Sequence, residues 1–304
     1  MSDTPNPVAG VLPVFQTPYH EDESIDYNTL AAEIDWLIEN GADGIVMAMV
    51  SEVLRLSGEE RDELAQEVCN FTAGRGCVVI SVGAESSHTA ARHAANAEKA
   101  GADALMAIPP VSVGVGEGEL RKYYARVFEA TTLPVIVQDA SGYVGQPMSV
   151  EFQASLLDEF GPDRALFKPE APPIGQRLSA LRDATDGQAK VFEGTGGIAL
   201  VDSYQRGVVG TIPGADLIRA IVPLWQALET GDMHRASEIH GPLSSLITLQ
   251  NSLDSFLAIE KHLLVRQGIF KNEIVRGPCG YSLDDETRSE VDRLFDLLLA
   301  ACTN

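Results

Sequence analysis

The chain has 304 residues, of which 45% are hydrophobic and 22% are charged, a composition that allows a large buried core and excludes a disordered protein. Its 22 basic and 44 acidic side chains give a formal charge of −22. This balance argues against the basic surfaces that nucleic acids and anionic membranes require, so we expect neither as a partner.

The sequence offers no membrane span and no cysteine framework. The longest apolar runs, 44–50 and 77–82, are much shorter than the roughly 20 residues needed to cross a bilayer. The first residues lack the basic and apolar regions of a secretion signal. The four cysteines lie far apart without a C-x-x-C pair, which fits neither a disulfide framework nor a zinc site. We therefore expect a reduced, cytoplasmic protein without a metal.

Short β-rich runs alternate with amphipathic stretches along the first 215 residues. The predicted strands are 10–17, 44–50, 78–83, 104–109, 134–139, 165–168, 190–193 and 208–212. The helices predicted between them are 27–39, 59–72, 89–100, 119–131, 150–160, 175–184 and 198–206. Eight strand–helix units predict an α/β fold in which parallel strands close into a (β/α)₈ TIM barrel.

Beyond residue 215 the pattern is purely helical. The predicted helices are 216–230, 234–249, 253–267 and 284–302. The first of these completes the barrel, and the other three form a C-terminal helical appendage. We accordingly expect a barrel with the active site over residues 1–231 and an appendage over residues 232–304.

Lys168 is the residue that stands out, because the chain has only six lysines and this one ends an apolar strand. Active sites of TIM barrels lie at the C-terminal ends of the strands. Removal from water favours a neutral amine, which can attack a ketone and form a Schiff base. The spacing alone equally allows a structural ion pair with Glu170, so both interpretations stay open at this point.

Several motifs together resemble the dihydrodipicolinate synthase / N-acetylneuraminate lyase superfamily of class I, Schiff-base aldolases. They cover nearly the whole chain and lie at 10–14, 17–19, 41–44, 57–61, 101–104, 109–110, 133–137 and 167–168. The resemblance implies that Lys168 forms an imine with a small 2-keto acid. It also implies that no cofactor other than this imine is needed and that the protein is a homo-oligomer, commonly a tetramer.

Two segments depart from the pattern of the family's synthases. After the second strand, the family's Gly-Thr-Thr-Gly-Glu is replaced by Ala-Met-Val-Ser-Glu at 48–52. The resemblance implies that this segment holds the substrate carboxylate, through the amides of Val50 and Ser51 and the Ser51 hydroxyl, although Ser51 can equally be a cap or turn residue. The fifth strand ends in Gln138 instead of the family's tyrosine. Because an amide does not titrate usefully, Tyr143 is the candidate proton donor in its place.

The sixth strand reads Lys-x-Glu, and residues two apart on a strand share a face, so Glu170 is expected beside the Lys168 amine. A carboxylate there can take the C3 proton of a bound 2-keto acid and help a C4 hydroxyl to leave as water. Glu193 ends the seventh predicted strand and is expected to face the sugar-acid hydroxyls, although the glycine-rich segment that it begins can equally be a tight turn. The resemblance places Ile212 and Gly214 against the imine pocket.

Three functions follow from these patterns. The segments after strands two, five and six are together similar to the 2-keto-3-deoxy sugar-acid (arabonate) dehydratases, which favours dehydration through an imine on Lys168. The second hypothesis is a pyruvate-dependent aldolase or a 4-hydroxy-tetrahydrodipicolinate synthase-like enzyme that makes or breaks a carbon–carbon bond. The third is a paralogue that binds a 2-keto acid without catalysis.

Overall fold

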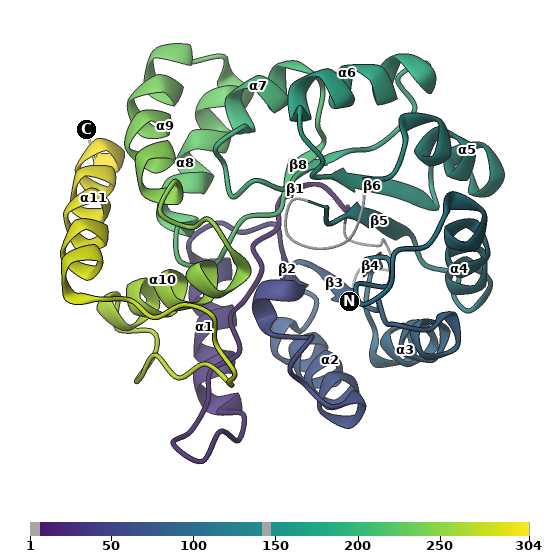
Figure 1. Ribbon diagram of the computed structural model, residues 1–304. Helices are drawn as coiled ribbons and strands as arrows, with labels where there is room; N and C mark the ends of the chain where they lie inside the picture. The colour runs from purple at the N-terminus through teal and green to yellow at the C-terminus, as the bar shows by residue number, and fades with distance from the viewer. Residues whose placement is uncertain (1–6, 142–146, 304) are drawn as a thin grey trace.

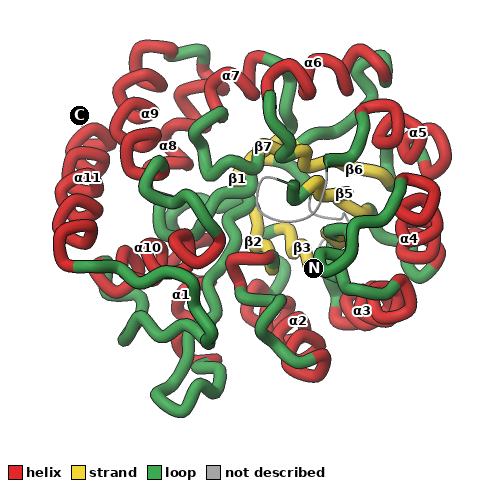
Figure 2. The backbone as a smooth tube through the Cα atoms, in the orientation of Figure 1, coloured by secondary structure: helices red, strands yellow, loops and turns green. Residues whose placement is uncertain are grey.

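Short parallel strands lie at the centre of a ring of helices in the computed structural model, which describes residues 7–141 and 147–303 (Figures 1 and 2). The strands are β1 (Gly10–Val11), β2 (Gly44–Met47), β3 (Cys77–Ser81), β4 (Ala104–Ala107), β5 (Val135–Asp139), β6 (Ala165–Pro169), β7 (Phe192–Glu193) and β8 (Gly210–Thr211). The helices of the barrel are α1 (Tyr27–Glu39), α2 (Gly58–Thr72), α3 (Ser87–Ala100), α4 (Glu117–Glu129), α5 (Val150–Phe160), α6 (Ile174–Ala184), α7 (Leu200–Gln205) and α8 (Ile218–Thr230).

The eight strands form one closed barrel. Strands β2 to β6 pair in sequence order, and β1, β8 and β7 pair with one another, all in parallel. Single bridges join the two groups, from Val14 to Val46 on one side and from Phe167 to Val191 on the other. The predicted (β/α)₈ architecture is confirmed.

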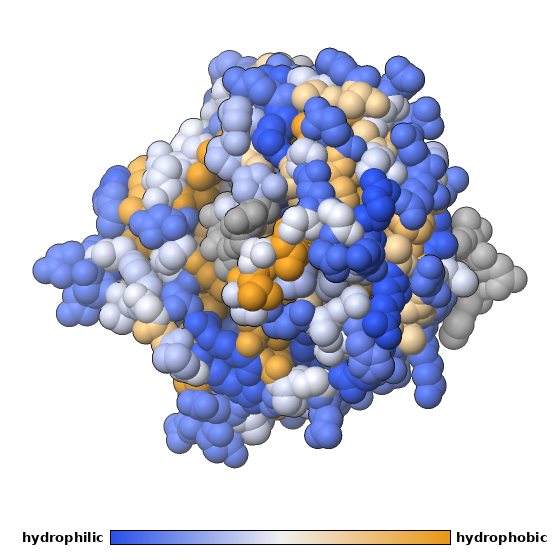
Figure 3. Space-filling model, turned by 45° about the vertical axis from the view of Figure 1, so that its right-hand side comes forward, coloured by the Kyte–Doolittle hydropathy of each residue, from blue (hydrophilic) through white to orange (hydrophobic). Residues whose placement is uncertain are grey.

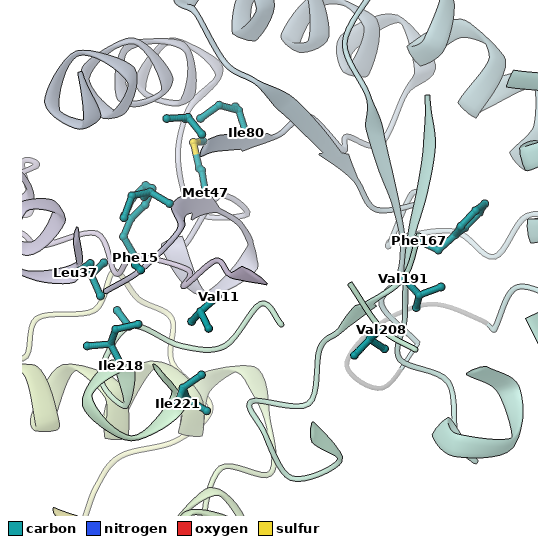
Figure 4. Packing of buried hydrophobic residues seen from close by; sticks show 14 of the residues in the cluster. Val11, Phe15, Leu37, Met47, Ile80, Phe167, Val191, Val208, Ile218 and Ile221 are labelled. Carbon is teal, nitrogen blue, oxygen red and sulfur yellow. The ribbon is translucent and has the colours of Figure 1, made fainter. Parts of the chain in front are cut away.

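Alternation along each strand builds two apolar layers. Leu166 belongs to the cluster inside the barrel, whereas its neighbour Phe167 belongs to the layer between the strands and the helices. Figure 4 shows this outer layer where Phe15, Leu37 and Ile218 converge between the first strand, α1 and α8. The same alternation turns Lys168 back toward the barrel axis, two residues after Leu166.

Five predicted strands end earlier than expected, and two of them end three or more residues early. The predicted strand 10–17 appears as β1 plus a bridge at Val14, because Pro13 has no amide hydrogen to add to a ladder. The predicted strand 44–50 ends at Met47 and continues as a 3₁₀ turn, η1 (Met49–Ser51). The turn forms because the Ser51 amide donates to the Ala48 carbonyl, 3.0 Å away, and the Ser51 hydroxyl accepts from the Ala48 amide.

The three C-terminal helices are α9 (Met233–Ile247), α10 (Leu253–Arg266) and α11 (Asp285–Thr303). Gly231, in the left-handed region at φ 74°, ends α8, so the predicted boundary at 231/232 falls in the turn before α9. Helices α9 and α11 pack beside α8, while α10 lies against η1 at the mouth of the barrel (Figure 1).

One face of the molecule shows how polar residues are distributed on its surface. Hydrophilic residues cover most of the face shown in Figure 3. Within the two described ranges, no helix has the length and apolarity that crossing a membrane requires.

Candidate active site

A cavity lies at the C-terminal ends of the strands and has an empty volume of about 440 Å³, the open space at its mouth included. Its wall combines residues at or just after the ends of β1, β2, β5, β6, β7 and β8 with one face of α10. The lining residues are Val14, Ala48, Met49, Val50, Gln138, Lys168, Glu170, Gly194, Gly196, Ile212, Pro213, Gly214, Leu253, Phe256 and Glu260.

A chain of three buried polar side chains lies in this wall. Strands β5 and β6 pair with Gln138 opposite Lys168, so both side chains point into the barrel at the same level. The Lys168 ammonium donates to Glu170 Oε1 at 2.6 Å, and Gln138 Nε2 donates to Glu170 Oε2 at 2.8 Å. The Glu170 amide continues the ladder by donating to the Asp139 carbonyl, which fixes the direction of the carboxylate.

The environment of Glu170 suits a group that exchanges protons. The side chains of Lys168 and Glu170 are only 6% and 3% exposed. Burial raises the pKa of Glu170, and the neighbouring Lys168 charge and the hydrogen bonds from Lys168 and Gln138 oppose this effect. A carboxylate beside an amine can accept a proton as that amine attacks a carbonyl, and can later act on the carbon next to the imine.

Gly194 leaves the space that the lysine occupies. A Cβ atom at this position would lie 2.7 Å from Lys168 Cε, 2.8 Å from Lys168 Nζ and 3.1 Å from Glu170 Oε1. The lack of a side chain at Gly194 therefore allows the Lys168 amine to pack closely against the loop after β7.

Six of the residues predicted for the site line this cavity: Val50, Gln138, Lys168, Glu170, Ile212 and Gly214. Tyr143, the predicted proton donor, lies outside the described residues.

Ser51 is buried but is absent from the lining of the cavity. Its hydroxyl donates to the Phe15 carbonyl at 2.7 Å and accepts from the Ala48 amide at 3.1 Å, and its amide donates to the Ala48 carbonyl. These bonds occupy the amide and the hydroxyl of Ser51, which were expected to hold the substrate carboxylate together with the Val50 amide. Ser51 therefore shapes the turn that presents Val50.

Glu193 is likewise absent from the lining. Its Oε1 accepts from the Thr195 amide at 2.6 Å and from the Thr195 hydroxyl, and its Oε2 accepts from the Thr211 hydroxyl at 2.8 Å. The carboxylate thus ties β7 to β8 and to the following loop, in which Gly194 and Gly196 reach the cavity.

Glu52, the acid that follows Ser51, holds α10 in place through an ion pair. Glu52, in a left-handed conformation at φ 60°, accepts from Lys261 at 2.5 Å, and neither side chain is exposed. Lys261 also donates to the carbonyls of Thr17 and Ile274, at 2.9 and 2.6 Å.

The sequence analysis missed the contribution of α10. Leu253, Phe256 and Glu260 are spaced by three and four residues, which places them on one helix face. An acid on an otherwise apolar face was the available signal, but nothing in the sequence shows that this face meets the barrel mouth. The described residues contain no group of three or more histidines, cysteines and acids arranged to hold a metal ion.

The model of the dihydrodipicolinate synthetase family matches residues 7–297. The chain belongs to this family. Its members are lyases and synthases, and this chain is accordingly a Schiff-base lyase of the family.

Known relatives carry out more than one reaction. The chain is 28% identical to the L-2-keto-3-deoxyarabonate dehydratase of Azospirillum brasilense over 290 residues, which cover 93% of this chain and 92% of the relative. It is 27% identical to the 4-hydroxy-tetrahydrodipicolinate synthase of Methanococcus vannielii, over 79% and 82% of the two chains. It is also 31% identical to a probable 2-dehydro-3-deoxy-D-pentonate aldolase of Escherichia coli, over 47% and 48%.

Solved structures share the fold. A family member from Escherichia coli K12, solved in complex with pyruvate, matches with a TM-score of 0.87 at 24% identity, over 96% of this chain and 98% of the other. A putative dihydrodipicolinate synthetase from Pseudomonas aeruginosa matches with a TM-score of 0.86 at 24% identity, over 96% of this chain and all of the other.

Proposed function

We propose that this enzyme dehydrates a 2-keto-3-deoxy sugar acid through an imine on Lys168. The observation that carries the proposal is the Glu170 carboxylate, 2.6 Å from the Lys168 amine, at a site where strand β5 offers Gln138 and no phenol. The site thus has a base for the carbon next to the imine. The similarity to a dehydratase over 93% of the chain supports the same reaction.

The reaction begins with attack of the Lys168 amine on the C2 carbonyl, which releases water and leaves a protonated imine. The imine draws electrons from C3, so Glu170 can remove a C3 proton and form an enamine. The enamine electrons then expel the C4 hydroxyl, which leaves as water after taking up a proton. A proton moves from C5 to C3, the C5 alcohol becomes an enol and then an aldehyde, and water frees Lys168 with release of a 2,5-dioxo acid.

The remaining lining residues are assigned to binding. We place the substrate carboxylate at the backbone of Val50, and the sugar chain against Ile212 and Gly214. Gln138 holds the Glu170 carboxylate in position through its 2.8 Å hydrogen bond. Ser51 and Glu193 support these groups from behind. Tyr143 stays a proposed proton donor that lies outside the described residues.

An aldolase is the second candidate, because the chain is 31% identical over half its length to a probable pentonate aldolase. Retro-aldol cleavage needs a base that removes a proton from the C4 hydroxyl, whereas dehydration needs an acid that donates one. A binding protein without catalysis is the third candidate, since an imine can form without further chemistry.

Imine trapping separates these functions. Borohydride would be added with pyruvate and then with 2-keto-3-deoxyarabonate, and the labelled peptide mapped by mass spectrometry. We expect a reduced adduct on Lys168 and, without borohydride, loss of water and no release of pyruvate. Release of pyruvate would establish the aldolase, an adduct without turnover would establish the binding protein, and the lack of an adduct with either compound would refute all three.

A Glu170→Gln variant tests the base. It keeps the size of the side chain and removes the basic oxygen, so we expect trapping by borohydride to persist and kcat to fall about 10²- to 10⁴-fold. Turnover at the wild-type rate would remove Glu170 from the mechanism.

Three further points are proposals as well. The chemistry uses no cofactor apart from the imine, so dialysis against a chelator should leave activity unchanged. Four free cysteines among the described residues fit a reducing compartment such as the cytoplasm. A homotetramer is proposed from family membership, and light scattering on the purified protein tests it.

A further inference from the structure

The wall of the cavity holds a second carboxyl group, which comes from α10 and not from a strand of the barrel. Glu260 of α10 lines the same cavity as Lys168 and Glu170, and it is 1% exposed. The mechanism above gives it no role, although the departing C4 hydroxyl needs a proton from a group other than the base at Glu170.

Glu260 belongs to a buried cluster of acids that meets at the strand ends. Its Oε2 accepts a hydrogen bond from the side-chain Nε2 of Gln16. The backbone amide of Gln16 donates to Glu33 Oε1 at 3.0 Å. A Cβ atom on Gly214 would lie 2.5 Å from Glu260 Oε1 and 2.8 Å from Asp216 Oδ1. Oxygens of both acids therefore border the same point of the cavity wall, where a side chain at position 214 would sit.

The cluster has more acids than cations to balance them. Glu33, Asp216 and Glu260 are each no more than 1% exposed. The nearest cation on α10, Lys261, is already bound to Glu52, which also lies within 4.0 Å of Arg55. Among the described residues, neither Glu33 Oε2 nor Asp216 Oδ2 has a hydrogen-bond partner.

Three buried acids without their own cation cannot all be ionised, because each negative charge is poorly solvated and opposes the others. Burial, with the neighbouring Asp216 and Glu33 charges adding to it, raises the pKa of Glu260 well above its ordinary range, and Gln16 and Lys261 only partly oppose this. Burial also raises the pKa of Glu33 well above its ordinary value and that of Asp216 to about 7. Burial and the mutual repulsion of the three carboxylates thus both favour the protonated form of Glu260.

We infer that Glu260 is the general acid that protonates the departing C4 hydroxyl, with Asp216 and Glu33 as positioning residues that keep it protonated. This inference rests on the proposed dehydration. The C4–oxygen bond breaks, its electron pair stays on the oxygen, the oxygen takes the Glu260 proton and leaves as water, and Glu260 remains as a carboxylate. Solvent at the mouth of the cavity returns the proton before the next turnover. A protonated acid at this position serves dehydration and is the wrong form to start retro-aldol cleavage.

A Glu260→Gln variant separates this step from the earlier ones. Pyruvate forms the imine and exchanges its methyl protons with deuterated water through Lys168 and Glu170, and it has no C4 hydroxyl. We expect the variant to keep borohydride trapping and proton exchange with pyruvate within about threefold of wild type. Its kcat for dehydration of 2-keto-3-deoxyarabonate should fall about 10²- to 10⁴-fold.

A substrate with a better leaving group provides the decisive readout. Fluoride leaves with far less need of a proton than hydroxide does, so Glu260→Gln should release fluoride from the 4-fluoro analogue at nearly the wild-type rate. In the wild type, kcat for the hydroxy substrate should fall as rising pH removes the Glu260 proton, and the fluoro substrate should lack this decline. The pH comparison uses only the wild type and stays decisive if the variant does not fold.

The outcomes distinguish this inference from the proposal on which it rests. If the wild type neither dehydrates the hydroxy substrate nor releases fluoride, the proposed function is wrong. If the wild type dehydrates and Glu260→Gln does so equally fast, only the role of Glu260 is wrong. An equal loss with the hydroxy and fluoro substrates would show a structural role and would also overturn the inference.

Discussion

Replacing Gly194 with alanine tests whether the position of the Lys168 amine controls the reaction. The added Cβ would lie 2.7 Å from Lys168 Cε and 2.8 Å from Nζ, where ordinary contacts are 3.4–4 Å. Gly194 does not lie in the left-handed region, so the backbone tolerates alanine, and the lysine end must retreat by about 1 Å. A displacement of that size costs about 10²-fold in rate.

The assay compares Gly194→Ala with the wild type in imine trapping by pyruvate and in dehydration of 2-keto-3-deoxyarabonate. Both rates should fall about 10²-fold, while the free energy of unfolding changes by about 1 kcal/mol, because the displaced atoms end a flexible side chain. Gly118→Ala in α4 is the matched control, since among the described residues no atom beyond its chain neighbours and the adjoining backbone of α4 lies within 4 Å of the Cβ it adds. Wild-type rates in Gly194→Ala would show that the packing around the amine is irrelevant to catalysis.

Two further predictions concern stability. Lys261→Met removes the nearer cation of the buried Glu52 and leaves only Arg55, 4.0 Å away. The free energy of unfolding in urea should fall by about 3 kcal/mol, with partial recovery in the Glu52→Gln/Lys261→Met double variant; a loss below about 1 kcal/mol would contradict this. Burial of Asp26 opposes its ionisation, but hydrogen bonds from Lys271 and Thr29 outweigh this and lower its pKa from 3.8 to about 2. Because the folded pKa is the lower one, the charge stabilises the fold above pH 4 and this contribution is lost as the pH falls toward 2. The wild type should therefore exceed Asp26→Asn by about 1 kcal/mol or less at pH 6, and this difference should shrink as the pH falls from 4 toward 2; a difference that does not change with pH would argue against the ion pair with Lys271.

The barrel could be predicted from the sequence because its signals are local. Strand alternation and helix periodicity repeat eight times, and a lysine next to the apolar run 165–167 is visible without any tertiary information. The spacing of Lys168 and Glu170 likewise sufficed to place both on one face, since two residues on a strand always share a side.

The parts of the site that the sequence does not reveal depend on contacts between distant segments. The hydroxyl of Ser51 donates a hydrogen bond to a carbonyl 36 residues away in the chain, and Glu193 accepts one from Thr211 on the neighbouring strand β8. No periodicity reveals such partners. Glu260 was missed for the same reason, because its neighbours Gln16 and Glu33 are more than 200 residues distant in the chain.

The burial of α10 against η1 means that the barrel alone does not contain the whole catalytic cavity. The wall is completed by three residues of α10: Leu253, Phe256 and Glu260. The ion pair between Lys261 and Glu52 fixes the position of this helix relative to the segment after β2. A chimera that kept this barrel and took its C-terminal helices from another family member would inherit that member's cavity wall as well. Exchange of α10, with residue 52 exchanged alongside it, is therefore a direct route to altering which substrates the enzyme accepts.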